Sequence, residues 1–247
     1  MDHLEHCSAL EVEVNRFSTA LEDVDFSSTV PSCPEWSVHD LAEHLGYVHR
    51  WAEHLVRVVA PQRISWEEMD FERGPIDAPW LRRGGAQLLD TLRRADPDAP
   101  MWAWGADQHV RFWSRRQLHE TMVHRVDLEL ARGVAPRVEP GIASDAIDEF
   151  LANLRRASNF SPKVLNLRGS GETLRFTSLD APGTWTIRLD EEGFGPVDGV
   201  NDPDVVLAGP AEEVLLVLYR RRPLDETLET SGDLGLLSFW LANSALE

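Results

Sequence analysis

The sequence predicts an α+β protein in which a helical bundle is followed by a small domain of strands and helices. Over residues 1–158, apolar residues recur at the three- to four-residue spacing of amphipathic helices. After Pro162 the spacing shortens to two residues, which is typical of strands with one buried face. A group of helices followed by a group of strands favours an α+β class. We therefore expect two domains, 1–158 and 159–247.

The first two helices are separated by a short loop. Apolar residues follow helical spacing over residues 3–25, and residues 27–34 are expected to form the loop. Ser37 is suited to cap the second helix, because its hydroxyl and Asp40 three residues later form a shortened capping box. This helix is expected to end before Pro61, since a proline disfavours helix in the residue that precedes it.

Three further helices complete the predicted bundle. Residues 61–79 contain three prolines and scattered charge, and are expected to form a long excursion of the kind that often has a function. A third helix is expected over residues 79–95, a fourth from a cap at Ser114 to Gly133, and a fifth over residues 141–156. Helices connected in this order form an up-down bundle, whose facing helices commonly build metal sites.

The C-terminal domain is predicted from period-two segments that turns separate, followed by apolar helices. Glycine-containing turns divide the first three of these segments. The predicted strands are residues 164–168, 173–177, 184–189 and 204–207, and the predicted helices are 211–221 and 233–242, with a short extended piece at 228–230 between them.

Composition limits the classes of partner. The chain has 247 residues, of which 43% are hydrophobic and 27% charged, as is ordinary for a globular protein. Its formal net charge is −18. An acidic surface repels nucleic-acid phosphates and anionic lipids, so we expect neither a nucleic acid nor a membrane as partner.

Cysteines and apolar runs give no sign of secretion. Cys7 and Cys33 are the two cysteines, and no disulfide framework can be built from them. Cys33 is expected to be a small packed loop residue. The first residues lack the basic and apolar regions of a signal peptide, and no apolar run is long enough to span a bilayer. We expect a cytoplasmic protein of unknown oligomeric state.

Glu120 and His124 form the most informative pattern in the chain. In a helix, four residues advance about 400°, so the two side chains project from one face, one turn apart. A carboxylate and an imidazole so placed can hold two corners of a divalent metal ion. His44, on the apolar face of the second helix, could supply a third ligand and leave positions open for water or substrate. That layout is typical of a catalytic metal site rather than a structural one.

Other histidines compete for this role. His39 and His49 are each five residues from His44, about 140° around the helix, and cannot share one core ion with it. His49 and His54 are expected to be packing or partly exposed residues. His119 points about 100° away from the neighbouring carboxylate, which favours a packing role or a role in supporting the ligands. The pair alone has limited specificity, because such pairs are commonly solvated or part of a core.

Two stretches of sequence resemble a known family. Residues 30–46, with the letters VPSCPEWSVHDLAEHLG, and residues 112–127, with FWSRRQLHETMVHRVD, resemble the maleylpyruvate isomerase N-terminal family, a branch of the DinB-like helical bundles. In that family, a histidine of the first stretch and the Glu-x-x-x-His of the second hold the metal. The resemblance therefore implies that His44, Glu120 and His124 are the ligands.

The resemblance extends to the domain organisation. It covers about residues 1–158 as a DinB-like up-down bundle, and residues 159–247 resemble the sterol-carrier-like domain that often follows. Lys163 is the only lysine among many arginines, which fits a GC-rich genome such as those of actinobacteria, where the family is abundant.

The resemblance also implies a chemistry. Members of the family use low-molecular-weight thiols, notably mycothiol, and include isomerases and thiol transferases. We therefore expect a divalent metal, best matched by Zn²⁺, that activates mycothiol against a small electrophilic substrate. Two alternatives remain open: a binding protein for an apolar small molecule, with a structural or vestigial metal site, and a metal-dependent hydrolase.

Supporting residues are expected around this site. Asp127 could orient the imidazole of His124, or could pair at the surface with Arg125 or Arg50. Arg222, the last of three arginines that end an apolar helix, is the candidate to clamp a substrate or cofactor carboxylate, and otherwise serves the helix dipole. Five tryptophans near the two stretches could line a pocket or could be core aromatics; they are Trp36, Trp51, Trp102, Trp104 and Trp113.

Overall fold

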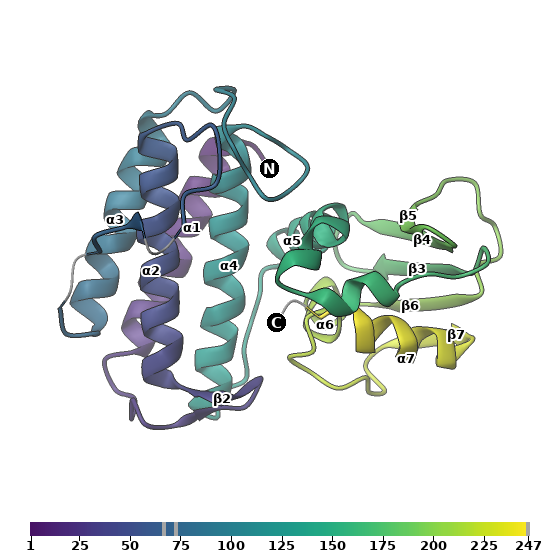
Figure 1. Ribbon diagram of the computed structural model, residues 1–247. Helices are drawn as coiled ribbons and strands as arrows, with labels where there is room; N and C mark the ends of the chain where they lie inside the picture. Colours follow the sequence, from purple (N-terminus) through teal and green to yellow (C-terminus); the bar gives the residue numbers. More distant parts are fainter. Residues whose placement is uncertain (66–67, 72–73, 246–247) are drawn as a thin grey trace. The chain divides into compact units, whose positions relative to one another are not determined.

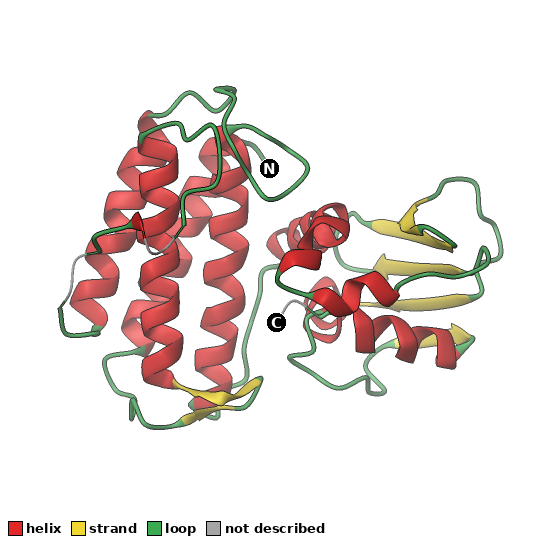
Figure 2. Cartoon of the chain, in the orientation of Figure 1, coloured by secondary structure: helices red, strands yellow, loops and turns green. Residues whose placement is uncertain are grey.

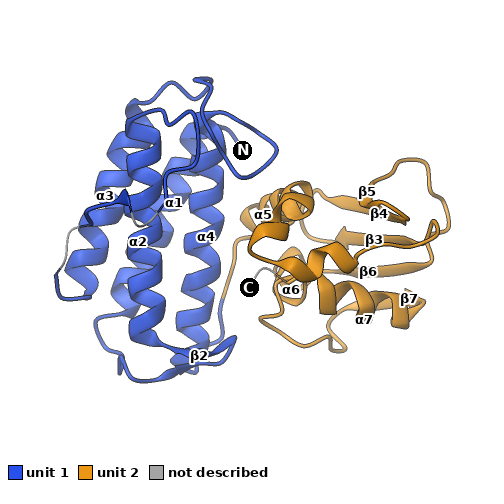
Figure 3. Cartoon of the chain, viewed as in Figure 1, with its two compact units in different colours: residues 1–136 blue, residues 137–247 orange. Residues whose placement is uncertain are grey.

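The computed structural model describes residues 1–65, 68–71 and 74–245. The chain forms two units, Met1–Pro136 and Arg137–Glu247 (Figure 3). The first is almost entirely helical, and the second combines a sheet with helices (Figure 2). This arrangement confirms the predicted α+β class, with a helical bundle followed by a small α+β domain.

Four long helices lie side by side in the first unit (Figure 1); they are α1 (His3–Ala20), α2 (Val38–Arg57), α3 (Ala78–Arg94) and α4 (Val110–Ala131). Both α1 and α2 pack against α3 and α4. Phe17, Leu41 and Trp80 are fully buried between them. Trp80 lies so close to Gly46 that a Cβ there would meet its ring at 1.9 Å, so glycine lets α3 approach α2 just after His44.

The observed start of α2 agrees with the sequence prediction, and that of α4 differs from it. Ser37 caps α2, and the reciprocal bonds of its capping box with Asp40 are both present. Ser114 does not cap α4, because the helix begins four residues earlier, with His109 as a cap that forms no side-chain bond. The Ser114 hydroxyl donates instead to the Arg111 carbonyl within the helix, 3.0 Å away.

The predicted loop at residues 27–34 contains a short hairpin. Its strands are β1 (Thr29–Val30) and β2 (Cys33–Ser37), which pair antiparallel and run directly into α2. The predicted excursion over residues 61–79 includes residues 66–67 and 72–73, which lie outside the described residues. On its described part, the Ile64 carbonyl accepts from the Trp51 indole at 2.9 Å, which ties the excursion to α2.

The second unit begins with α5 (Pro140–Asn153), which packs against α6 (Ala211–Leu218). The ring of Phe150 lies 4.8 Å from that of Tyr219, between centroids. The Glu212 carboxylate accepts from the Val138 amide at 2.6 Å, which anchors the segment before α5. The division between units therefore falls before the fifth helix, whereas the sequence predicts a boundary after it, near residue 158. The helical periodicity of this segment could not show which unit its apolar face joins.

One five-stranded sheet forms the centre of the second unit, in the order β5-β4-β3-β6-β7. Neighbouring strands are antiparallel except β3 and β6, which are parallel. The strands are β3 (Thr173–Ser178), β4 (Thr184–Asp190), β5 (Gly193–Pro196), β6 (Val205–Gly209) and β7 (Glu229–Gly232), and α7 (Leu234–Asn243) follows. The sequence predicted all of these except β5.

The strand predicted at residues 164–168 is wrong. Two short 3₁₀ helices, Leu154–Asn159 and Pro162–Asn166, occupy this region. Pro162 stands in the first turn of the second helix, where its missing amide hydrogen costs nothing. Leu165 is 56% exposed, so the alternating apolar pattern did not mark a buried strand face. Among the described residues, no helix is both long and apolar enough to cross a membrane.

Candidate metal centre

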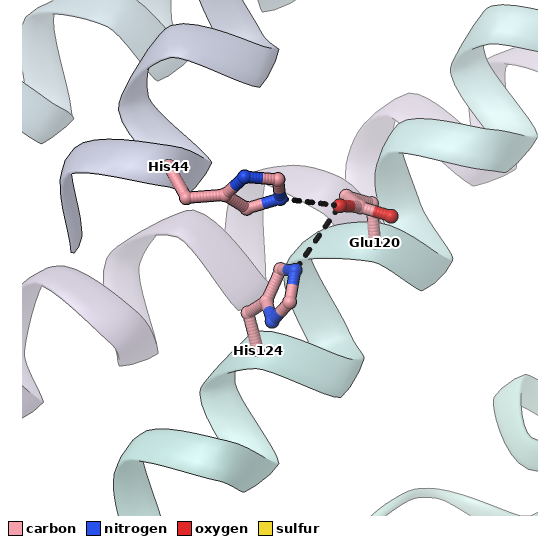
Figure 4. Close-up of side chains that lie close together, drawn as sticks. All are labelled: His44, Glu120 and His124. Carbon is pink, nitrogen blue, oxygen red and sulfur yellow. Dashed lines mark hydrogen bonds and ion pairs between the residues drawn. The ribbon is translucent and has the colours of Figure 1, made fainter. Parts of the chain in front are cut away.

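One imidazole from α2 and an imidazole and a carboxylate from α4 converge in the first unit (Figure 4). His44 Nε2 lies 3.3 Å from Glu120 Oε1, and His124 Nε2 lies 3.1 Å from the same oxygen. The two imidazole rings meet edge to face, with centroids 5.0 Å apart. His124 is buried, whereas the other two side chains are partly open to solvent. The structure thus brings together the three residues that the sequence predicts as ligands.

The spacing of these donor atoms suits a divalent ion. One ligand atom from each residue lies within 4.8 Å of the others. Two ligands of a tetrahedral ion with bonds of about 2.1 Å are roughly 3.4 Å apart, close to both nitrogen–oxygen separations described above. Two imidazoles and a carboxylate are donors that Zn²⁺ and related ions accept. The residues present therefore fit a metal, and the metal itself stays a prediction.

Four residues on one face of α4 make up what we call the α4 stripe: Arg116, Glu120, His124 and Asp127. They follow each other at intervals of four, four and three residues, which keeps their side chains on one side of the helix. Arg116 Nη2 donates to Glu120 Oε2 at 3.0 Å, and its side chain is only 6% exposed. Arg116 was not predicted from the sequence, although its position one turn before Glu120 was a usable signal.

Asp127 supports the His124 ligand from behind. It is fully buried, and its Oδ2 accepts from His124 Nδ1 at 3.0 Å. The other oxygen accepts from the Ser32 hydroxyl, which the β1–β2 hairpin brings to α4. The predicted orientation of His124 by Asp127 is therefore observed. Arg125 forms ion pairs with Glu13 and Glu129.

Charges in the site shift two pKa values in opposite directions. Partial burial raises the pKa of the Glu120 carboxyl, but His124, His44 and Arg116 outweigh it and hold this pKa well below its ordinary value. Burial lowers the pKa of His124, but Glu120 and Asp127 outweigh it and raise the pKa to about 9. Without a metal, His124 is therefore protonated at neutral pH, so metal uptake must release that proton.

Aromatic side chains flank the site unequally. The Trp36 ring, from β2, lies 4.9 Å from the His44 ring and 6.4 Å from the His124 ring, between centroids. Trp36 is therefore a candidate for the predicted pocket wall, which stays a prediction. Trp51, Trp102 and Trp113 pack on one another in the bundle, as core aromatics do.

The remaining candidate histidines are not part of the three-residue cluster. His49 is fully buried, and its Nε2 pairs with the Thr121 hydroxyl at 2.8 Å. Burial lowers the pKa of His49 to about 3, so it is neutral. His39 forms a second, exposed group with Asp40 and Glu43, but the Asp40 carboxylate is engaged in the α2 cap.

Arg222 lies in the second unit, where its guanidinium pairs with both oxygens of Glu213. Arg220, two residues earlier, adopts a left-handed φ of 59°, which ends α6 abruptly. The predicted role of Arg222 in binding a carboxylate stays a prediction.

Comparisons with known proteins agree with this architecture. Residues 7–129 match the model of the mycothiol maleylpyruvate isomerase (MDMPI) N-terminal domain, and residues 140–239 match that of the MDMPI C-terminal domain. The gap between the matches contains the division between the two units. A search of curated proteins found no match.

Two solved structures share the fold. A crystal structure of the mycothiol-dependent maleylpyruvate isomerase is 17% identical, with a TM-score of 0.56. A mutant of that enzyme is 16% identical, with a TM-score of 0.58. Each comparison covers 94% of this chain and 93% of the other. Because the two domain models account for most of the sequence, the chain belongs to the mycothiol maleylpyruvate isomerase family.

Proposed function

We propose that this protein is a metal-dependent, mycothiol-using isomerase or transferase, in which His44, Glu120 and His124 hold a divalent ion. The observation that carries the proposal is the convergence of three metal-binding side chains from two helices. Three protein donors leave a tetrahedral position open, as in catalytic zinc sites. Zn²⁺ is the best match to this donor set. Family membership supports mycothiol as the thiol, since the similar solved structures are those of a mycothiol-dependent isomerase.

A bound Zn²⁺ would lower the pKa of a coordinated thiol, so that its thiolate forms near neutral pH. The chain's own residues prepare the ligands for this task. Asp127 accepts a hydrogen bond from His124 Nδ1, which would leave Nε2 to bind the metal. The Trp36 ring lies near both imidazoles and would give a metal held by them an apolar neighbour. A thiolate held there would meet a small electrophile at close range.

The isomerase and the transferase begin in the same way and end differently. In either reaction the thiolate sulfur would form a bond to an electrophilic carbon of the substrate as a π bond at that carbon opens. An isomerase would then let the substrate rotate about the resulting single bond and expel the thiolate as the double bond forms again. A transferase would keep the carbon–sulfur bond, and the substrate would instead take up a proton or lose a leaving group. The isomerase is favoured because it is the activity that the two similar structures carry.

Metal content tests the ligand set directly. The full-length protein should copurify with about one divalent ion per chain. His44→Ala, Glu120→Ala and His124→Ala should each lose most of it. His39→Ala is the matched control, because His39 lies on the same helix and is exposed. Stoichiometric metal in His124→Ala would show that this ligand set is wrong.

A cobalt-substituted protein tests the thiol. Adding mycothiol should produce an intense sulfur-to-cobalt charge-transfer band, which fades at low pH as the thiol regains its proton. Cys33→Ser should keep the band, because the sulfur belongs to the added thiol. If saturating mycothiol gives no band while cobalt is bound, thiol activation is refuted. Activity on a substrate without any thiol would then favour the hydrolase, and its absence the binding protein.

A further inference from the structure

Arg116 contacts the oxygen of the Glu120 carboxylate that the imidazoles do not contact. Its Nη2 lies 3.0 Å from Glu120 Oε2, whereas both histidines contact Oε1. Figure 4 shows this division, with one carboxylate oxygen turned to the imidazoles and the other turned away. The two oxygens of Glu120 therefore have different partners.

The guanidinium is held firmly enough to maintain this division. Its side chain is 6% exposed, and its central carbon lies 5.9 Å from the centroid of the Trp104 ring, within reach of a cation–π attraction. Arg116 stands one turn before Glu120 on the same helix, so the helix itself places the two side chains next to each other. A buried, charge-assisted hydrogen bond of this kind is among the stronger ones in proteins.

This contact limits how Glu120 can bind a metal. A carboxylate that binds through both oxygens must turn both toward the ion and so occupies two coordination positions. To do this, the Glu120 carboxylate would have to turn about its Cγ–Cδ bond, which would move Oε2 away from its place 3.0 Å from Arg116 Nη2 and strain that hydrogen bond. While the bond holds, Glu120 offers Oε1 alone. The position that Oε2 would fill then stays available to a ligand from solution.

We propose that Arg116 is a positioning residue that keeps Glu120 a one-oxygen ligand and so preserves the open coordination position. The inference rests on the proposed metal binding by His44, Glu120 and His124. It assigns to Arg116 an effect on coordination number, which a merely structural arginine would not have.

Cobalt in the full-length protein provides the test, because its visible d–d absorption is strong in four-coordinate sites and weaker in five-coordinate ones. Arg116→Met should still bind Co²⁺, but its d–d absorptivity should fall roughly twofold as Glu120 takes a second position and the site expands to five ligands. Arg116→Lys, which keeps a cationic donor, should stay closer to wild type. If Arg116→Met does not fold, Arg116→Leu, which also lacks a donor, is measured in its place with the same expectation.

Arg111→Met is the matched control. Arg111 is also on α4, but it pairs with Asp107 and should leave the spectrum unchanged when replaced. A wild-type spectrum in cobalt-loaded Arg116→Met, or the same loss of intensity in Arg111→Met, would overturn the role of Arg116. Failure of the wild-type protein to bind Co²⁺ would instead overturn the proposed function, and this inference with it.

Discussion

Replacing Asp127 by Asn tests how a buried carboxylate supports a metal ligand. Asp127 is fully buried and accepts from His124 Nδ1 at 3.0 Å. Asn keeps the shape but removes the charge, and its amide is a weaker acceptor. The imidazole should then be less well oriented and less basic. We expect the affinity for a divalent metal to fall, by an amount that depends on pH.

Two opposing effects determine the size of the loss. Removing a partner of a metal-bound histidine costs roughly 10–100-fold in affinity, or about 1.4–2.7 kcal/mol. In the wild type, however, the pKa of His124 is about 9, so at pH 7 metal binding must also remove a proton, at a cost of about 3 kcal/mol. In the Asn variant the pKa of His124 is lower, so removing its proton on metal binding costs less. The deficit should therefore be small near pH 7 and reach its full size above the wild-type pKa of about 9.

Competition against a chromophoric chelator measures this deficit across the pH range. Wild-type affinity should rise about tenfold per pH unit up to the pKa of His124, and the variant should level off at lower pH. Ser32→Ala is the graded control, because it removes one donor to Asp127 and leaves the carboxylate in place. A variant as tight as wild type above the pKa of His124 would refute the orienting role of Asp127. A deficit of equal size at every pH would refute the competition with the proton.

Three further predictions concern stability. Val59→Gly should raise the free energy of unfolding by about 1 kcal/mol in thermal melts, because the valine has a left-handed φ of 47°; a lower melting temperature would contradict this. Burial lowers the pKa of His49 to about 3, so the unfolded state binds more protons below about pH 6.5 and stability falls as pH falls. Between roughly pH 7 and pH 4, His49→Gln should reduce the fall in the free energy of unfolding by about 3 kcal/mol, as measured by denaturant titration. An unchanged dependence of stability on pH would count against this. Arg125→Met should destabilise by about 3 kcal/mol, because the buried Glu13 then keeps the longer 3.4 Å contact with the part-exposed Arg16 in place of its 2.8 Å bond to Arg125; equal stability would refute a structural role.

The three candidate ligands could be predicted because each is marked by residue spacing or by its neighbours within one helix. Glu120 and His124 are one helical turn apart, and His44 lies beside apolar residues on the inward face of its own helix. The resemblance of the two segments to one family then paired them. The α+β class could also be predicted, because buried positions recur every three to four residues in helices and every two residues in strands.

Other features depend on contacts that no local pattern encodes. Ser32 reaches Asp127 because a two-strand hairpin turns the chain back, but β1 has only two residues and burial along β2 does not alternate. The fifth helix has an apolar face that could have joined either unit, and it packs against α6. The alternation around Leu165 had the period of a strand, but that side chain is exposed in a 3₁₀ helix.

The α4 stripe makes the site sensitive to changes in length as well as in residue type. A single residue inserted between Arg116 and Asp127 would rotate everything beyond it by about 100° and move the later members off the shared face. A deletion would do the same in the other direction. Lengthening the connection between α2 and α3 would leave the stripe in register, because none of its members lies there. Homologous genes that keep this chemistry should therefore differ in length at residues 61–79 and never between residues 116 and 127.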